Sequence, residues 1–278
     1  MTVQEALKSA RERLRDVPEP KLDAECLLSH VMNIGRLDLL MDKGRALTNG
    51  EAAEFERLVA LRQTRQPLQY ILGSQSFMGF PFKTDARALI PRFDTEALCV
   101  EALRHIRPGS RVLDLCTGTG CLAVSIKKLR PGAEVTATDI SGDALALARE
   151  NAEALNARVR FLRGDLFAPV GDESFDVIVS NPPYIPSGLR GTLQPEVEKE
   201  PPLSLFAGED GLKFYRRIAR EAPLHLAEGG FLCLETGDGE SEAVAQLLRQ
   251  DFDGIRILPD LGGLPRVVSA RKKEGTKP

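Results

Sequence analysis

The segment Asn181-Pro182-Pro183-Tyr184 is the strongest candidate for chemistry in this sequence. It follows an apolar run, residues 175–180, that is typical of a buried strand. The two prolines contribute no N–H group, so the polar atoms on offer are acceptors, namely the side-chain oxygen of Asn181 and the carbonyl oxygen of Pro182. Two acceptors suit a planar –NH2 group, and Tyr184 adds a flat face for stacking. This pattern predicts a pocket for a planar amine.

Such a pocket would work by positioning. The nitrogen of an amide or arylamine is a poor nucleophile because its lone pair is delocalised. Holding both N–H bonds would aim that lone pair at an electrophile and stabilise the charge that develops on nitrogen, without a histidine base. Asn181, Pro182 and Tyr184 are the predicted catalytic residues, and Pro183 completes the substrate site. The alternative interpretation is a rigid turn that ends a strand and buries Tyr184.

A second constellation lies upstream, in the stretch VLDLCTGTGCLA at residues 112–123. It predicts a strand, a glycine turn and the start of a helix, and Gly118 and Gly120 would let the backbone come close to a ligand. Acidic residues lie at the carboxyl ends of three successive predicted strands, at Asp114, Asp139 and Asp165. In an open parallel sheet such strand ends meet at one crevice.

The chemistry of these acids suggests one kind of ligand. Asp114 suits a cationic amino group, Asp139 the two hydroxyls of a ribose, and Asp165 the exocyclic amine of adenine. A carboxylate at Asp114 would repel a pyrophosphate, which disfavours a nicotinamide dinucleotide. The expected cofactor is therefore S-adenosylmethionine. Each acid taken alone could also be a solvated loop residue or a helix cap.

These motifs need a scaffold, which the hydrophobic pattern supplies. Helical periodicity marks residues 3–14, 22–32, 37–41 and 51–63, with an Asn-Gly turn at 49–50. Phenylalanines around Gly79 and Pro81 suggest a short hairpin or extended linker. Strands are then predicted at 111–115, 134–138, 159–162, 175–180, 230–235, 256–258 and 266–270, with helices at 122–129 and 143–155 between the early ones. Strand–helix alternation predicts a Rossmann-like α/β fold with a mostly parallel seven-stranded sheet.

The bulk properties narrow the class of protein. The chain has 278 residues, 28% of them charged, a net charge of −3 and no long apolar run, so no membrane span is expected. Five cysteines without a CxxC pair favour a cytoplasmic protein, and three scattered histidines give no metal-site pattern. The acidic balance argues against direct nucleic-acid binding.

Several segments resemble the class I S-adenosylmethionine-dependent methyltransferases, and within them the release-factor glutamine N5-methyltransferases. The blocks are QPLQYILGSQSF, LIPRFDTE, VLDLCTGTG, SNPPYIP, EPPLSLFAGEDGLKFYRRI, GGFLCLETG and DLGGLPRVV, and they cover nearly the whole chain in order. The resemblance implies transfer of a methyl group to the glutamine of a Gly-Gly-Gln motif in peptide chain release factors. It implies a helical recognition domain at 1–66, a hairpin linker at 67–89 and a methyltransferase domain at 90–278.

Carried over by position, the resemblance also implies individual roles. The cofactor-binding set it gives is Asp114, Cys116, Thr117, Gly118, Thr119, Gly120, Asp139, Asp165, Leu166 and Asn181. The chain departs from the family pattern at Phe93, Cys116, Leu166 and Glu240, of which Cys116 and Leu166 bear on the cofactor contacts. Three other functions stay open at this point: an amino methyltransferase acting on adenine or guanine, a ligand-binding adaptor without catalysis, and a nicotinamide-dependent reductase.

Overall fold

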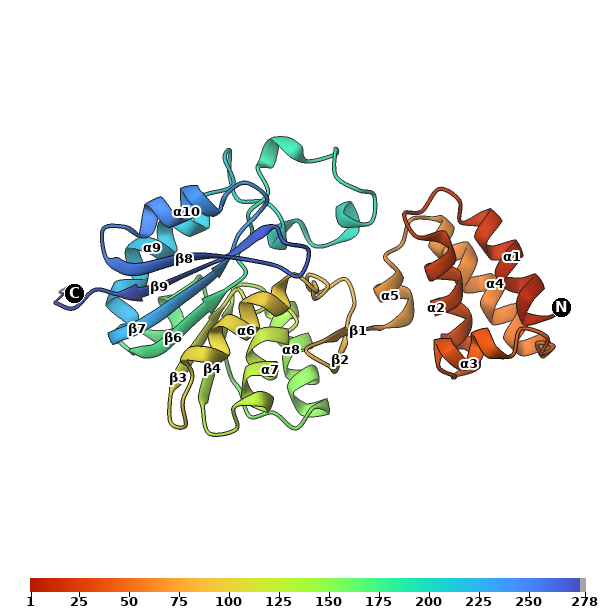
Figure 1. Cartoon of the computed structure of the whole chain (residues 1–278), viewed down its shortest axis with the longest axis horizontal. Coiled ribbons are helices and arrows are strands. Elements are labelled where there is room, and N and C mark those ends of the chain that lie inside the picture. Colours follow the sequence, from red (N-terminus) through yellow and green to blue (C-terminus); the bar gives the residue numbers. More distant parts are fainter. Residues whose placement is uncertain (276–278) are drawn as a thin grey trace. The chain divides into compact units, whose positions relative to one another are not determined.

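The computed structural model describes residues 1–275, so the last three residues of the predicted methyltransferase domain lie outside the described part. The chain forms two compact units (Figure 1). The first comprises Met1–Ser74 together with Gln194–Lys199, and the second comprises Gln75–Leu193 and Glu200 onward. A short internal segment, 194–199, therefore belongs to the N-terminal unit although its neighbours in sequence belong to the other.

The N-terminal unit is helical, as predicted. Its helices are α1 (Val3–Arg13), α2 (Pro20–Met32), α3 (Arg36–Met41), α4 (Asn49–Gln63) and α5 (Leu68–Leu72). Buried apolar side chains of α1, α2 and α4, among them Leu27, Phe55 and Leu58, form its core. The expected Asn-Gly turn at 49–50 is wrong. Thr48 and Glu51 make a reciprocal capping box, which starts α4 at Asn49 and places both residues in the first helical turn.

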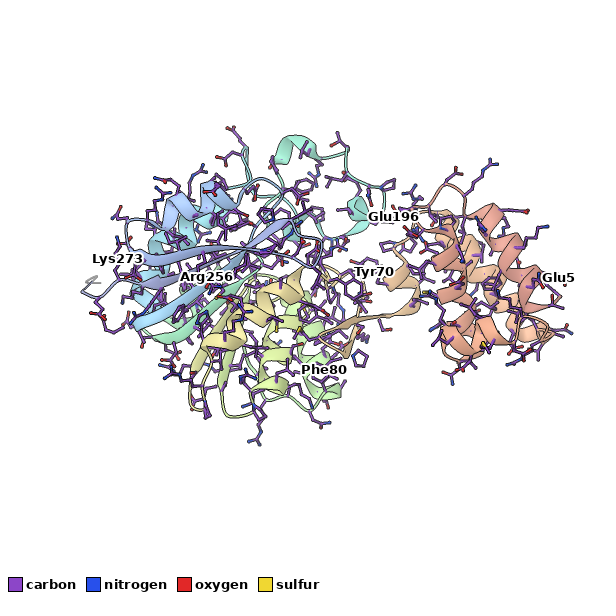
Figure 2. All side chains as sticks on the ribbon, viewed as in Figure 1. Glu5, Tyr70, Phe80, Glu196, Arg256 and Lys273 are labelled. Atoms are coloured by element: carbon purple, nitrogen blue, oxygen red, sulfur yellow. The ribbon has the colours of Figure 1, made fainter. Side chains whose placement is uncertain are left out.

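Ion pairs hold the segment 194–199 on the N-terminal unit. The Glu196 carboxylate accepts from Arg62 Nη1 at 2.8 Å and from Arg65 Nη2 at 2.6 Å (Glu196 is labelled in Figure 2). Arg62 is itself buried and also donates from Nε to Asp23 at 2.6 Å. This network explains why a loop that begins after the fourth strand of the main sheet returns to the helical unit.

The second unit begins with a hairpin of β1 (Ser74–Phe77) and β2 (Phe80–Lys83). Met78 and Gly79 at its tip have φ of 51° and 79°, the left-handed pair that a two-residue hairpin turn requires. The main sheet contains β3 (Arg111–Leu115), β4 (Glu134–Asp139), β5 (Arg160–Arg163), β6 (Phe175–Ser180), β7 (Leu226–Glu235), β8 (Phe252–Pro259) and β9 (Pro265–Lys272). Their order across the sheet is β5-β4-β3-β6-β7-β9-β8, with only β9 antiparallel to its neighbours. The predicted seven-stranded, mostly parallel sheet is confirmed.

Helices cover both faces of this sheet (Figure 1). They are α6 (Thr95–His105), α7 (Cys121–Leu129), α8 (Gly142–Ala154), α9 (Lys213–His225) and α10 (Ser241–Leu248). Short 3-10 turns lie at 168–170, 187–189 and 202–204 of this unit, and the one at 197–199 belongs to the N-terminal unit. Alternate residues of β3 belong to different cores: Val112 packs with α6 and α7, whereas Leu113 packs with α9 and α10. Burial on both faces explains why the central strands read as continuous apolar runs.

Candidate active site

The sheet register brings the predicted site residues to one edge. Leu115 at the end of β3 pairs with Thr138 of β4 on one side and with Ser180 of β6 on the other. Asp139 is the last residue of β4, and Asn181 follows β6 directly. Since β3 is central, the glycine turn after it lies between these two side chains. The order reversal of the sheet at β3 is the switch point at which such folds bind ligands.

Hydrogen bonds join the ends of β3, β4 and β5. Gly118 N donates to Asp139 Oδ2 at 2.9 Å, and Ser141 N donates to Asp139 Oδ1 at 2.8 Å. Thr138 Oγ1 donates to the carbonyl oxygen of Leu166 at 3.1 Å. Burial raises the pKa of Asp139 although these backbone N–H groups oppose the shift. The carboxylate keeps lone pairs for further donors, as recognition of a diol would require.

The turn after β3 has a left-handed backbone at Cys116, Gly118 and Gly120, with φ of 58°, 54° and 79°. A side chain at Gly120 would lie 3.0 Å from the Cβ of Ala148, so this glycine lets α7 begin close against α8. Gly118 has open space where a side chain would be. The two glycines thus serve different ends: Gly120 serves packing, and Gly118 leaves room for a ligand.

Asp114 is fully buried behind this turn. Its Oδ2 accepts from the Thr117 hydroxyl at 2.6 Å and from Ala123 N at 3.2 Å, which fixes the turn to the start of α7. Its Oδ1 is buried and has no hydrogen-bond partner among the described residues. Burial raises the pKa of Asp114 to about 7 against the effect of these two hydrogen bonds. A buried acceptor without a donor is costly, and a ligand ammonium would satisfy it.

A cavity of 240 Å³ opens beside the strand ends. Of the predicted cofactor residues, Cys116, Gly118, Asp139, Asp165, Leu166 and Asn181 line it, and Pro183 of the predicted substrate site does too. Asp114, Thr117, Thr119, Gly120, Pro182 and Tyr184 do not line it. No sequence motif assigns a role to the other lining residues, which include Arg87, Leu89, Ile140, Leu203, Lys213, Phe214 and Arg217.

Asp165 and Leu166 lie at the β5 side of the cavity. The Asp165 carboxylate is half-exposed and makes a two-pronged ion pair with Arg217 of α9, at 3.0 Å for each contact. A carboxylate so engaged still has acceptor capacity for an amine. Leu166 is buried and has a left-handed φ of 49°. Both departures from the family pattern near the cofactor, Cys116 and Leu166, thus occupy left-handed positions that non-glycine residues seldom adopt.

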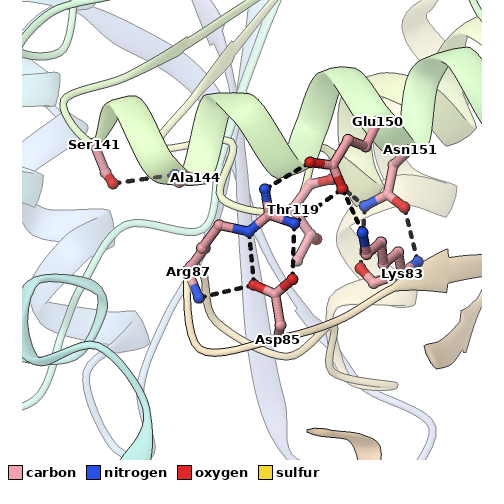
Figure 3. A network of polar contacts seen from close by, with 8 residues as sticks. All are labelled: Lys83, Asp85, Arg87, Thr119, Ser141, Ala144, Glu150 and Asn151. Carbon is pink, nitrogen blue, oxygen red and sulfur yellow. Dashed lines mark hydrogen bonds and ion pairs between the residues drawn. The ribbon is translucent and has the colours of Figure 1, made fainter. Parts of the chain in front are cut away.

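Arg87 is held at the cavity by a polar network (Figure 3). Its guanidinium contacts Asp85 at 2.8 Å and Glu150 of α8 at 2.7 Å, and these hydrogen bonds raise its pKa. Next to it, the buried Asn151 side chain accepts from Lys83 N at 2.7 Å and donates to the carbonyl oxygen of Thr119 at 2.9 Å. The network joins the hairpin, α8 and the glycine turn, so that the wall of the cavity is preorganised.

The Asn181–Tyr184 segment forms the other wall. Asn181 Nδ2 donates to the Thr95 hydroxyl at 3.1 Å, which leaves Asn181 Oδ1 as the acceptor on offer. Pro182 and Pro183 are buried. Burial raises the pKa of Tyr184 to about 12, so its hydroxyl stays protonated at neutral pH and is no general base. The planar-amine pocket predicted from sequence remains a prediction, now with a defined orientation for Asn181.

Two glycines lie directly beside Tyr184, where a side chain would have no room. A side chain at Gly237, after β7, would lie 2.9 Å from Tyr184 Cδ2, and one at Gly211 would lie 2.4 Å from the Tyr184 carbonyl oxygen. Glu240 accepts from Gly237 N at 3.1 Å and lies against both glycines. The blocks AGEDGL and ETG therefore support the reactive segment, which explains their presence far along the chain.

The block at 90–96 has structural contacts of its own. Glu200, which is buried, accepts from Ile90 N at 2.9 Å and forms an ion pair with Arg92. Glu96 accepts from Met78 N at 2.7 Å and so fixes the hairpin tip. Phe93 is 59% exposed.

Among residues 1–275 no cluster of three or more histidine, cysteine or acidic side chains is arranged to hold a metal ion. The helices of this part of the chain are also too short or too polar to span a membrane.

The site suits the cofactor that the sequence predicted. The Asp139 carboxylate and the predominantly apolar lining of the cavity match a sugar diol and an aromatic base, and the orphaned Asp114 oxygen behind the glycine turn matches an ammonium. The carboxylates at these strand ends would repel a pyrophosphate, although three cationic side chains also line the cavity, namely Arg87, Lys213 and Arg217.

Comparison with known proteins identifies the family. Residues 5–73 match the model of the PrmC N-terminal domain, and residues 92–192 match that of the methyltransferase small domain. The release factor glutamine methyltransferase of Geobacter sulfurreducens is 43% identical over 97% of this chain and 96% of its own, and that of Deinococcus radiodurans is 41% identical over 99% and 100%. The protein of the same name from Cereibacter sphaeroides is 44% identical over 98% and 99%.

Solved structures support the fold. A methyltransferase from Pyrococcus furiosus aligns with a TM-score of 0.55 and 22% identity, over 71% of this chain and 91% of that one. A Thermus thermophilus 16S rRNA methyltransferase, solved with AdoMet and guanosine, aligns with a TM-score of 0.51 and 20% identity, over 72% of this chain and 50% of that one. Because the three relatives named above are 41–44% identical over nearly the full length, this chain belongs to the release factor glutamine methyltransferase family.

Proposed function

We propose that this chain transfers a methyl group from S-adenosylmethionine to the side-chain amide nitrogen of the glutamine in the Gly-Gly-Gln motif of peptide chain release factors. The observation that carries the proposal is the orientation of Asn181. Its Nδ2 is engaged by Thr95, so the cavity wall offers an acceptor oxygen, and a primary amide is a donor of matching shape. The family membership of the whole chain supports the choice of a protein glutamine over a nucleobase.

The chain's own residues supply binding and orientation. Asp114 Oδ1 would hold the ammonium of the cofactor, Asp139 the ribose hydroxyls, and the Asp165–Leu166 side of the cavity the adenine. When bound, S-adenosylmethionine supplies an electrophilic methyl group on a positively charged sulfur, and the thioether product S-adenosylhomocysteine is neutral. A general acid for the leaving group is therefore unnecessary.

Asn181 Oδ1 and the Pro182 carbonyl oxygen accept the two N–H groups of the substrate amide. This contact fixes the amide plane so that the nitrogen lone pair faces the methyl group. The same two oxygens would stabilise the positive charge that nitrogen gains as its bond to the methyl carbon forms and the bond from that carbon to sulfur breaks. Nitrogen would then release one proton to water. Tyr184 provides the flat side of the pocket, and its high pKa leaves it in the neutral form.

The remaining assignments complete the proposal. The helical domain at 1–66 recognises the body of the release factor, the segment 67–89 links it to the catalytic domain at 90–278, and the reaction takes place in the cytoplasm with the translation machinery. No direct contact with nucleic acid is needed, in keeping with the net charge of −3.

Labelled S-adenosylmethionine offered with three acceptors, a purified release factor, total RNA and double-stranded DNA, tests the proposal. Label is expected in the release factor alone. A release factor whose motif glutamine is replaced by alanine is the control, and it is expected to stay unlabelled. Incorporation into RNA or DNA, with the release factor unlabelled at stoichiometric enzyme, would overturn the proposal in favour of a nucleobase methyltransferase.

A further inference from the structure

A buried acid stands behind the reactive asparagine. Glu235 is the last residue of β7, and its side chain is almost completely inaccessible. Ser180 of β6 pairs with Leu234 of the parallel strand β7, so the next residues, Asn181 and Glu235, are neighbours at the same sheet edge. None of the ion pairs within residues 1–275 includes Glu235, and its Oε2 has no hydrogen-bond partner in that part of the chain. A carboxyl group in this position calls for an explanation.

Thr95 lies between the acid and the amide. It is the first residue of α6 and is 2% exposed. Its hydroxyl accepts from Asn181 Nδ2 at 3.1 Å, and it lowers the pKa of Glu235 by hydrogen bonding. The three side chains, carboxyl, hydroxyl and amide, are therefore neighbours that come from three different parts of the catalytic unit.

The chemistry of this chain gives it a direction. A carboxylate has only acceptors, whereas a hydroxyl has one hydrogen and two lone pairs. The Thr95 hydroxyl accepts from Asn181 Nδ2 and so presents a lone pair to the amide, and its hydrogen remains available to the neighbouring carboxylate. Only the –NH2 end of the asparagine amide can meet a lone pair. Its oxygen end is then fixed on the opposite side, where the proposed substrate amide needs an acceptor.

We propose that Thr95 and Glu235 are positioning residues that fix the polarity of the Asn181 amide. This inference rests on the proposed function, because it assigns the Asn181 oxygen to a substrate –NH2 group. An asparagine amide can flip at little intrinsic cost, and a flipped amide would present –NH2 to –NH2. The two orientations of the amide have almost the same shape, and the carboxylate makes them differ in hydrogen bonding.

Protonation of Glu235 would remove that asymmetry. A carboxylic acid can donate to Thr95, which then donates to Asn181 Oδ1 and favours the flipped amide. Burial raises the pKa of Glu235 to about 7, against the hydrogen bond from Thr95 and the attraction of Arg266. The other groups that act on it are Asp94 and Arg92 before α6, Tyr184 after β6, Tyr215 of α9 and Cys121 of α7. The correct amide orientation is thus present above this pKa and is lost as the pH falls through it.

Substitutions at both positions test the proposal by their kinetics. Thr95→Val keeps the shape and removes the hydroxyl, and it is expected to lower kcat about tenfold, with the Kd for S-adenosylmethionine within twofold of the wild type. Thr95→Ser keeps the hydroxyl and is expected to recover most of that loss. Ser125→Ala, which removes a buried hydroxyl without a partner from α7, is the control for altered packing. Equal losses in the valine and serine variants would show that the threonine methyl matters and the hydroxyl does not.

The pH dependence gives a second readout. The wild type is expected to lose kcat on the acidic side with an inflection near the Glu235 pKa, and Glu235→Gln is expected to lack that inflection. Glu101→Gln replaces another buried acid, one that pairs with Arg104 on the far part of α6, and is expected to keep the wild-type profile. Retention of the inflection in Glu235→Gln would refute the role of this acid.

A measurement without substrate separates this inference from the proposed function. In the full-length protein labelled with 15N at asparagine, the Asn181 side-chain amide resonance is assigned by its absence in Asn181→Ala. It is expected to shift with pH around the Glu235 pKa in the wild type and to be insensitive there in Glu235→Gln. An unshifted wild-type resonance would contradict the inference even if release factor is methylated. If the resonance shifts but the enzyme methylates only RNA, the result would support the positioning role of Thr95 and Glu235 and refute the proposed substrate.

Discussion

Gly237 offers a direct test of how the site holds Tyr184. The backbone of Gly237 does not require glycine, so Gly237→Ala adds a methyl group without straining φ. That methyl would lie 2.9 Å from Tyr184 Cδ2 and 2.8 Å from Glu240 Oε2, both well inside van der Waals contact. The Glu240 carboxylate is at the end of a flexible side chain and can move away from the added methyl group. Tyr184 is attached to two prolines and packs against the core, so relief at that contact must displace the ring.

The expected magnitude follows from this geometry. Overpacking by one methyl group costs about 1–3 kcal/mol. For a unit of this size, that loss lowers Tm by about 2–4 °C per kcal/mol. A displacement of several tenths of an ångström at a reacting group is expected to reduce kcat between about tenfold and a hundredfold.

Methyl transfer to a purified release factor at saturating S-adenosylmethionine measures the effect, with the cofactor Kd from calorimetry and Tm from circular dichroism. Gly44→Ala is the matched control, since a side chain there meets nothing within 4 Å. A kcat within twofold of the wild type, together with a lowered Tm, would refute the claim that Gly237 positions Tyr184 for catalysis.

Three further predictions concern other parts of the chain. Asn181→Ala is expected to lower kcat at least a hundredfold while the cofactor Kd stays within a few-fold, because its main contact forms in the transition state; lost cofactor binding with normal turnover at saturation would contradict this. Asp139→Asn is expected to raise the cofactor Kd about tenfold or more, measured by calorimetry, because a charged acceptor for two hydroxyls becomes a neutral one; an unchanged Kd would remove Asp139 from the ribose site. Burial raises the pKa of Glu196, but hydrogen bonds from Arg65 and Arg62 outweigh burial and hold this pKa at about 2. The Glu196 carboxylate therefore stabilises the N-terminal unit by on the order of 2 kcal/mol at pH values above the ordinary pKa of a glutamate. This stabilisation is lost as the pH falls toward 2. Thermal melts between pH 6 and pH 3 are expected to show this loss in the wild type and not in Glu196→Gln.

Much of the fold could be predicted because its signals are local. The run 112–115 is apolar except for Asp114 and is buried on both faces, as a central parallel strand is, and the capping-box spacing of Thr2 and Glu5 marks the start of α1 as the structure has it. The turn predicted at Asn49-Gly50 is wrong, because the capping box at Thr48 outweighs the turn preference of Asn-Gly. Strand lengths at β7 and β8 were underestimated because their first residues carry weak strand signals.

The site could be predicted only where residues follow a strand. Asp139, Asp165 and Asn181 stand at strand ends, so the parallel topology alone brings them together. Arg87, Lys213 and Arg217 come from a loop and a helix, and no spacing in the sequence links them to the cavity. No spacing in the sequence links Thr95 or Glu235 to Asn181 either. Glu235 does end an apolar strand, however, and Asp114 lies one residue before the end of another. An acid at the end of a buried strand is the one signal that could have found it.

The most direct test of the central claim is tandem mass spectrometry of a release factor treated with this enzyme and S-adenosylmethionine. We predict one added methyl group on the side-chain nitrogen of the Gly-Gly-Gln glutamine, absent when Asn181→Ala replaces the wild-type enzyme. A methyl group at any other residue, or an unmodified motif peptide at stoichiometric active enzyme, would contradict the account.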